Sequence, residues 1–257
     1  MILFTIAEAT KKRVAAEKKQ KSLEEVKRKA LLLPKKKFEF ERQLAKDGMS
    51  FICEVKKASP SKGIIAEDFP YVDIAKQYEK AGASCISVLT EPDFFKGDKK
   101  YLKEISDVVN IPCIRKDFVV DEYMIYDARI HGAGCVLLIC SLLDEETIAR
   151  YIKICDSLGI SALVEAHDAK EIKKAVNAGA RIIGVNNRDL KTFTVDISNS
   201  ERLRELVPNN ILFVAESGIK TKEDIRRLKE ANVDACLIGE TFMKSPDKEK
   251  MLKELDS

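Results

Sequence analysis

One pattern recurs four times along the chain, at intervals of roughly fifty residues, and it limits the fold more than any other feature of the sequence. Each copy is the end of an amphipathic helix, a single Gly or Asn, and then a short apolar run. A Gly or Asn at that place is typical of the left-handed residue that closes a helix. The four copies are YEKAGASCISVL, ARIHGAGCVLLI, AVNAGARIIGVN and LKEANVDACLIG, with their markers at Gly82, Gly132, Gly179 and Asn232.

Each interval between markers holds one further apolar run, and another such run precedes the first marker. The repeating unit is therefore strand-helix-strand-helix, which predicts eight strands. Strands that alternate with amphipathic helices pair in parallel, and eight such units predict a closed (β/α)8 barrel, or TIM barrel. The predicted strands span residues 50–57, 85–91, 111–118, 135–140, 161–166, 182–188, 210–217 and 235–240.

We expect one α/β domain over residues 1–257, because this length is ordinary for a single (β/α)8 barrel. Residues 50–257 would form the barrel. Residues 1–49 are charged and helix-like with a break at Pro34, so we expect them to form an N-terminal helical extension. A doubly wound open sheet is the alternative fold. That fold usually carries a Gly-rich dinucleotide motif after its first strand, and EVKKASPSKG is not such a motif.

Charge and cysteine content argue against several classes of function. The 45 Lys and Arg nearly balance the 42 Asp and Glu, so the charge gives no reason to expect a nucleic-acid partner. The seven Cys form no CxxC pair and mostly lie inside apolar runs. We therefore expect reduced, buried thiols in a cytoplasmic protein, with no metal site. No apolar run approaches the ~18 residues of a membrane span, no signal peptide is visible, and nothing indicates an obligate interface, so we expect a monomer without membrane contact.

Charged residues stand where the predicted strands end, which is the end that carries the active site in (β/α)8 barrels. Glu54 and Lys56 share one face of the first strand, and Lys116 and Glu165 have the same inward parity on later strands. A lone charge in a protein interior costs several kcal/mol, against a domain stability of ~5–15 kcal/mol. The cluster therefore favours the wet mouth of a pocket for an anionic ligand over a structural ring of salt bridges. The other inward positions are Phe118, Leu163, Gly184, Asn186, Arg188, Ser217 and Gly239.

Glycines follow the last two predicted strands, in the motifs AESGI and LIGE. They place Ser217-Gly218 and Gly239-Glu240 just beyond the strand ends. Barrels of this type often bind phosphate there, through backbone N–H groups and a helix N-terminus. Glycine lets the backbone approach a ligand closely, so the two motifs together predict a phosphate-binding site.

Seven stretches resemble, in order, the indole-3-glycerol phosphate synthase family of tryptophan biosynthesis. They are EVKKASPSKG, SVLTEP, RKDFVVDEYMIYDARIHGA, VEAHD, GVNNRDL, VAESGI and LIGETFM, and they span roughly residues 38–245. The resemblance implies a carboxy-lyase that converts 1-(2-carboxyphenylamino)-1-deoxy-D-ribulose 5-phosphate to indole-3-glycerol phosphate by ring closure, decarboxylation and dehydration. It implies a small phosphorylated substrate and no cofactor or metal.

The same resemblance implies roles for individual residues. Lys116 resembles the general acid of the family, and Glu165 resembles a second acid–base group used in losing the hydroxyl. Lys56 resembles a lysine that contacts anionic substrate groups, with Glu54 as its partner. The resemblance further implies that Asn186 and Ser217 serve the reacting groups, that Ser59 and Arg188 bind substrate, that Phe95, Phe118 and Leu190 form apolar walls around the anthranilate ring, and that Gly218, Gly239 and Glu240 bind phosphate, Glu240 through its backbone N–H alone.

Two other functions stay open at this point. One is a phosphosugar-binding barrel without catalysis, which the intact set of charged residues argues against. The other is a sister enzyme such as phosphoribosylanthranilate isomerase, expected to place a Cys base on the first strand. Cys53 lies on that strand, but with the parity of the helix-facing side. We also expect His167 to cap a loop and Asp117 to pair with a helix, and we hypothesise that residues 1–49 help to cover the pocket.

Overall fold

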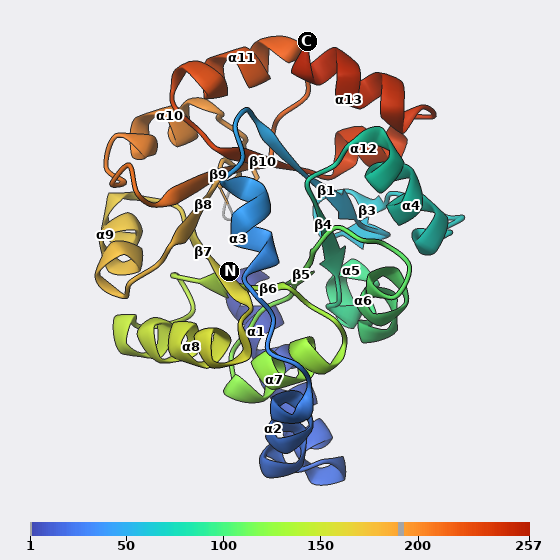
Figure 1. Ribbon diagram of the computed structural model, residues 1–257, viewed down its shortest axis with the longest axis vertical. Coiled ribbons are helices and arrows are strands. Elements are labelled where there is room, and N and C mark those ends of the chain that lie inside the picture. Colours follow the sequence, from blue (N-terminus) through green and yellow to red (C-terminus); the bar gives the residue numbers. More distant parts are fainter. Residues whose placement is uncertain (1, 190–192) are drawn as a thin grey trace.

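In a computed structural model that describes residues 2–189 and 193–257, eight parallel strands close into a barrel (Figure 1). Each barrel strand pairs with the next one along the chain, and β10 pairs with β1 to complete the ring. The predicted (β/α)8 barrel is thereby confirmed. The barrel strands are β1 (Ser50–Val55), β4 (Cys85–Leu89), β5 (Cys113–Lys116), β6 (Cys135–Ile139), β7 (Ser161–Ala166), β8 (Ile182–Asn186), β9 (Leu212–Glu216) and β10 (Ala235–Ile238).

Most predicted strands continue past the observed strand ends, because the chain takes up other local structure there. Beyond β1, residues Ala58–Ser59 (β2) and Gly63–Ile64 (β3) pair as a small antiparallel hairpin. Beyond β8, Arg188 forms an isolated bridge with Val195. The chain therefore forms other local pairings directly beyond the ends of these two barrel strands.

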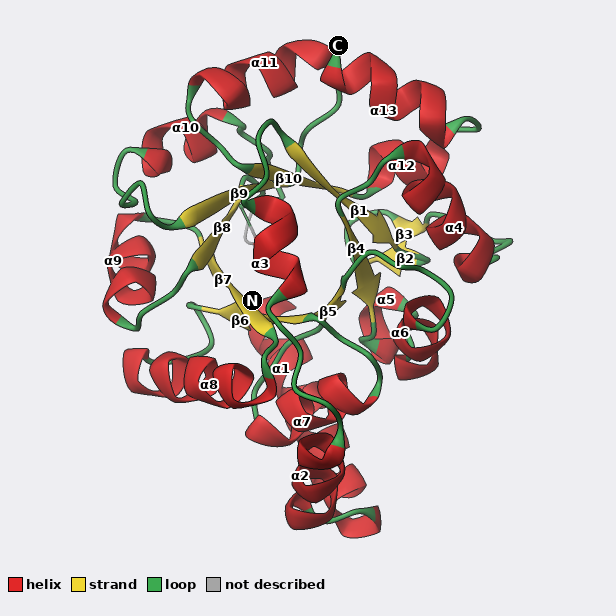
Figure 2. Cartoon of the chain, in the orientation of Figure 1, coloured by secondary structure: helices red, strands yellow, loops and turns green. Residues whose placement is uncertain are grey.

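A ring of helices surrounds the strands (Figure 2). The four repeat markers, Gly82, Gly132, Gly179 and Asn232, all have positive φ, as expected for residues that end a helix. The helices after the first strand are α4 (Tyr71–Ala81), α5 (Pro92–Phe95), α6 (Lys99–Ser106), α7 (Glu122–Ile130), α8 (Glu145–Leu158), α9 (Ala169–Asn177), α10 (Ser198–Arg204), α11 (Lys222–Glu230), α12 (Glu240–Lys244) and α13 (Lys248–Asp256).

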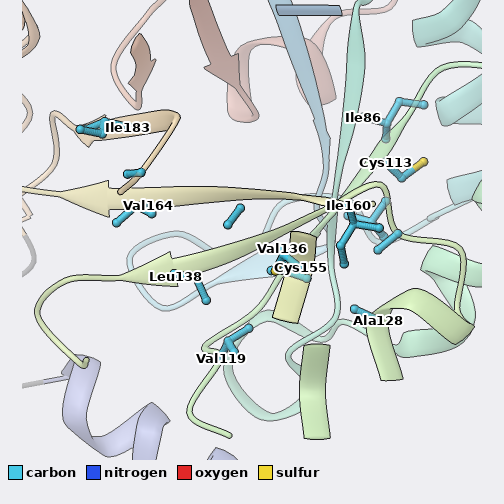
Figure 3. Close-up of a cluster of buried hydrophobic side chains, with 14 of the residues drawn as sticks. Ile86, Cys113, Val119, Ala128, Val136, Leu138, Cys155, Ile160, Val164 and Ile183 are labelled. Atoms are coloured by element: carbon cyan, nitrogen blue, oxygen red, sulfur yellow. The ribbon is translucent and has the colours of Figure 1, made fainter. Parts of the chain in front are cut away.

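Side chains of each strand alternate between the barrel interior and the layer between strands and helices. The interior is filled by residues such as Ile52, Ile114, Leu163 and Val214, which are fully buried. The outer layer forms the larger cluster, part of which is drawn in Figure 3 with Ile86, Val136, Val164 and Ile183. All seven cysteines are buried free thiols, as the sequence predicts.

The N-terminal extension reaches both ends of the barrel. It consists of α1 (Ile2–Gln20), α2 (Leu23–Leu32) and α3 (Glu39–Leu44). In Figure 2, α3 lies across the ring of strands, and its Phe40 and Leu44 are buried in the interior cluster. Leu3 of α1 belongs to the same cluster, and it also lines the cavity at the opposite end. Within the described residues, no helix combines the length and the apolar character needed to cross a membrane.

Truncating a buried side chain of α3, which fills the end of the barrel opposite the cavity, should lower the stability of the whole barrel. Leu44 is 1% exposed in the interior cluster, so Leu44→Ala should lower the free energy of unfolding by about 2–5 kcal/mol, through lost burial and a residual cavity. Leu32→Ala is the matched control, because Leu32 is 73% exposed on α2, and it should change stability by less than about 0.5 kcal/mol. Urea unfolding followed by circular dichroism measures both. Equal effects of the two substitutions would contradict the assignment of α3 to the core.

Candidate active site

A cavity of about 640 Å³ opens at the C-terminal ends of the barrel strands. Side chains from the strand ends form its floor, and loops and α1 form its walls. It brings together thirteen of the fourteen site residues that the sequence predicts, and Leu190, the remaining one, lies outside the described residues. The thirteen are Glu54, Lys56, Ser59, Phe95, Lys116, Phe118, Glu165, Asn186, Arg188, Ser217, Gly218, Gly239 and Glu240.

Lys116 is the centre of the charged floor. Its ammonium lies 3.2 Å from Glu165 Oε2 and 2.9 Å from Glu216 Oε2, and it donates a hydrogen bond to each carboxylate. Burial alone would lower the pKa of Lys116, but the attraction of Glu216, Glu165 and Glu54 outweighs burial and leaves the pKa raised. Lys116 is therefore a charged hydrogen-bond donor held at a fixed place.

The two carboxylates beside Lys116 have pKa values that are shifted in opposite directions. Burial raises the pKa of Glu216 to about 7, and the nearby charges of Glu165 and Glu54 contribute to the rise, although Lys116 opposes it. Burial acts in the same direction on Glu165, yet Lys116, His167 and a hydrogen bond from Asn186 outweigh it and leave the pKa of Glu165 lowered. Environments that push the pKa values of neighbouring acids apart are typical of acid–base catalysis.

Two glycines make room for the acidic side chains. A Cβ atom on Gly184 of β8 would collide with the carboxylate of Glu216, and one on Gly239 would collide with that of Glu54. Glu54 in turn forms an ion pair with Lys56, the partner that the sequence indicates. Glycine at these two positions therefore leaves the space that the carboxylates of Glu216 and Glu54 occupy.

One end of the cavity is lined by the backbone of the segments that follow β9 and β10 and by lysine side chains. Ser217 and Gly218 follow β9 with positive φ, and Gly239 precedes α12. Glu240 turns its carboxylate toward Lys244, at 2.6 Å, and toward Lys62, at 3.8 Å. The cavity lining also includes the lysines Lys62, Lys220 and Lys244, which the sequence analysis did not identify.

The other end is apolar. The rings of Phe95 and Phe118 lie with their centroids 5.9 Å apart and their planes tilted by 39°. Ile2, Leu3 and Ile6 of α1 line the same cavity, together with Leu89, Leu137 and Ile139 of the barrel. The cavity therefore has room for a molecule with an aromatic group and anionic groups at separate ends.

Comparison with known proteins decides the family. The model of the indole-3-glycerol phosphate synthase family matches residues 3–255. The chain belongs to the indole-3-glycerol phosphate synthase family. An indole-3-glycerol phosphate synthase of Ruminiclostridium cellulolyticum is 58% identical over 248 residues, 96% of this chain and 95% of that protein. One of Endomicrobium trichonymphae is 55% identical over 256 residues, 99% of each chain.

Solved structures of other proteins share the fold. A structure of 3-hexulose-6-phosphate synthase aligns with a TM-score of 0.65 over 81% of this chain and 98% of its own, at 15% sequence identity. At that identity the likeness extends to the barrel alone. The carboxy-lyase assignment therefore comes from the indole-3-glycerol phosphate synthase family.

Glu216 is the main residue of this family member that the sequence analysis missed. Ser217, predicted to be the inward residue of this strand, lines the cavity from just beyond the strand end, and the predicted parity is wrong. Leu212 and Val214 belong to the interior, so Glu216 also faces inward, and Ser217 follows the strand with φ of 70°. The alternation of inward and outward side chains, counted from Leu212 at the start of the strand, predicts that Glu216 faces inward.

Two residues discounted from the sequence have defined partners. Asp117 is 1% exposed and pairs with Arg115 and with Arg13 of α1, so its expected helix partner is present. His167 lies in the loop between β7 and α9, where its backbone N–H donates a hydrogen bond to the side chain of Glu171. Its ring, however, also reaches the catalytic candidate Glu165, at 3.5 Å.

The isomerase alternative fails on geometry as well as on family. Cys53 is fully buried in the cluster between strands and helices, away from the cavity. Burial raises the pKa of its thiol far above the usual range, so the thiol cannot serve as a base in the cavity. The parity argument made from the sequence is thus correct for β1.

The raised pKa of Glu216 makes stability depend on pH. Because the folded-state pKa, about 7, exceeds the ordinary value of 4.5, the folded state binds the proton more tightly, and stability falls as pH rises between these values. Glu216→Gln removes this loss. The free energy of unfolding of Glu216→Gln minus that of wild type should therefore rise by about 1–3 kcal/mol from pH 5 to pH 8.

Urea unfolding at several pH values measures this difference. Glu205→Gln is the matched control, since Glu205 is exposed, and its stability should run parallel to wild type at every pH. A Glu216→Gln curve that also runs parallel to wild type would contradict the raised pKa.

Proposed function

We propose that this chain converts 1-(2-carboxyphenylamino)-1-deoxy-D-ribulose 5-phosphate to indole-3-glycerol phosphate, carbon dioxide and water, with Lys116 as the general acid. The observation that carries the assignment of roles is the position of Lys116 between Glu165 and Glu216 on the cavity floor. Family membership supports the reaction, and the polar floor supports the acid–base chemistry that it requires.

Ring closure needs a cation at the ketone of the substrate. The ring carbon that carries the carboxylate attacks C2, and the carbonyl oxygen takes up a proton to become a hydroxyl. The ammonium of Lys116 polarises that oxygen and supplies the proton, because its raised pKa keeps it charged until the oxygen becomes basic. Loss of carbon dioxide from the ring carbon that attacked C2 then restores the aromatic ring.

Dehydration needs an acid and a base. The hydroxyl on C2 leaves as water after protonation, and a proton leaves C1 to form the indole double bond. Glu165, ionised by Lys116 and His167, accepts a proton in this step, and Lys116 or Lys56 gives one to the hydroxyl. Glu216, with a pKa of about 7, exchanges protons with Lys116 at neutral pH.

The two ends of the cavity fix the orientation of the substrate. The anthranilate ring lies against the rings of Phe95 and Phe118, where apolar side chains exclude water. The phosphate lies at the backbone N–H groups of Gly218 and Gly239 and gains charge from Lys220 and Lys244. Lys56, Ser59, Asn186, Arg188 and Ser217 hold the polar groups between these ends, and the phosphorylated substrate needs no cofactor or metal.

Turnover by wild type and by Lys116→Ala tests this assignment. Wild type should form indole-3-glycerol phosphate, and the folded variant should lose at least ~10²-fold in kcat, the usual range for one positioned proton donor. Lys173→Ala, which removes an exposed lysine of α9, should keep wild-type turnover. Circular dichroism checks folding.

The other outcomes are distinct. Turnover that survives in Lys116→Ala would move the acid role to Lys56. Substrate binding without turnover in wild type would indicate a phosphosugar-binding barrel that lacks catalysis.

We further propose that the protein works as a monomer in the cytoplasm, without a nucleic-acid partner. The near balance of charge supports the absence of nucleic acid, and seven free, buried thiols suit a reducing compartment. Light scattering behind size exclusion, with and without added oligonucleotide, should give the mass of one chain in both cases.

A further inference from the structure

His167 lies between two carboxylates just beyond the end of β7, where the chain enters α9. Its Nε2 is 3.5 Å from Glu165 Oε1, and its Nδ1 is 3.3 Å from Glu171 Oε2. The side chain is 19% exposed and does not line the cavity. The imidazole therefore contacts Glu165 from outside the cavity lining.

The two nitrogens have unequal partners. Nδ1 has a hydrogen-bonding contact with Glu171, whereas Nε2 is buried and has no hydrogen-bond partner among the described residues. A neutral imidazole carries one N–H, so a neutral ring that donates to Glu171 would turn a lone pair toward the carboxylate of Glu165. A protonated ring instead places a positive charge between the two carboxylates, with Nε2 3.5 Å from Glu165 Oε1 and Nδ1 3.3 Å from Glu171 Oε2, and this arrangement favours the protonated form.

The surroundings of the ring are mostly anionic. The charged groups around it are Glu165 of β7, Glu171 of α9 and Glu216 of β9, with Lys116 on the far side of Glu165. Burial lowers the pKa of His167, but the hydrogen bond to Glu171 and the charges of Glu165, Glu171 and Glu216 outweigh burial and leave the pKa raised.

Glu171 holds the ring in place. One oxygen of Glu171 accepts a hydrogen bond from Ser141 Oγ at 2.5 Å, and the other accepts the backbone N–H of His167 at 2.8 Å. The N-terminus of α9 is closed by Asp168, whose side chain accepts from two backbone N–H groups of the helix. The position of the imidazole is thus fixed by groups that lie outside the cavity.

We propose that His167 is a positioning residue for Glu165: as an imidazolium it holds the Oε1 oxygen and keeps the carboxylate ionised, which leaves Oε2 for Lys116 and the substrate. This inference rests on the role of Glu165 given under the proposed function. Lys116 and His167 then hold the carboxylate from opposite sides, and protonation of Glu165 is disfavoured until low pH.

The consequence for catalysis depends on pH with a definite sign. Removing the imidazolium raises the pKa of Glu165, so the acid limb of kcat/KM should move to higher pH by about one unit, as expected for the loss of one nearby opposite charge. Above the raised pKa of His167, wild type also loses this charge. The difference between wild type and variant should therefore be largest at acid pH and narrow at alkaline pH.

His167→Gln tests the proposal, because Gln keeps a hydrogen-bonding group but cannot carry the charge. Because the pKa of Glu165 lies below its ordinary value in wild type, the deficit in kcat/KM should grow on the acid side, toward roughly tenfold well below pH 5, and it should shrink toward pH 9, with KM changed by less than about threefold. His131→Gln is the matched control. His131 is the other of the two histidines, sits at the end of α7 and contacts Asp127, so this variant should keep the wild-type profile.

A uniform loss at every pH, or an unshifted acid limb, would overturn the proposal and leave His167 with a structural role. A second measurement does not need turnover or a folded variant. Nitrogen-15 NMR of the wild-type histidines should show His167 as an imidazolium at pH 7, and a neutral ring there would also overturn it. If wild type forms no product while His167 is an imidazolium, the proposed function fails and the charge on His167 stands.

Discussion

The structure depends on one ammonium group held between carboxylates inside a barrel. Lys116 contacts Glu165 and Glu216, and both acids are nearly fully buried. Burying such charges costs more than most packing can offset unless each one has a partner. Among the groups that line the cavity floor, three glutamates face two lysines, so one negative charge is in excess there, and His167 lies outside this lining. The raised pKa of Glu216 removes that excess near neutral pH, and this couples the protonation of the floor to the stability of the fold.

The barrel accommodates the charged floor by omitting side chains. The interior below it is packed with large apolar residues such as Ile52 and Leu163, whereas the positions next to the acids are glycines. Gly184 leaves space for Glu216, and Gly239 leaves space for Glu54. Close packing allows neither a larger residue at these positions nor an empty cavity in their place, so the acids and the glycines have to be explained together.

The repeat in the sequence predicted all eight strands, because each strand-helix unit has its own helix-ending residue and its own apolar run. The floor could be predicted from period-two parity wherever the strand was counted from its buried start, as for Glu54, Lys116 and Glu165. Parity failed at β9, where it was assigned from Ser217, a residue beyond the strand. The contact of His167 with Glu165 could not be predicted, since it depends on the path of a loop, which has no period. The hypothesis that residues 1–49 help to cover the pocket agrees with Ile2, Leu3 and Ile6 in the cavity lining. The packing of Phe40 and Leu44 into the barrel interior could not be predicted, because it depends on contacts distant in sequence.

The N-terminal extension contacts both the packed interior of the barrel and the walls of the cavity. Phe40 and Leu44 fill the interior at the end where the strands begin, and Leu3 reaches the same interior cluster beside the cavity. Arg13, further along α1, lies 3.3 Å from Glu91 and 3.5 Å from Asp117. Glu91 accepts the backbone N–H of Phe95, and Asp117 accepts that of Phe118, so one arginine contacts the supports of both aromatic walls. A segment that precedes the barrel in sequence therefore fills its closed end and shapes its open end, and the order of the site depends on the same contacts that hold the extension to the core.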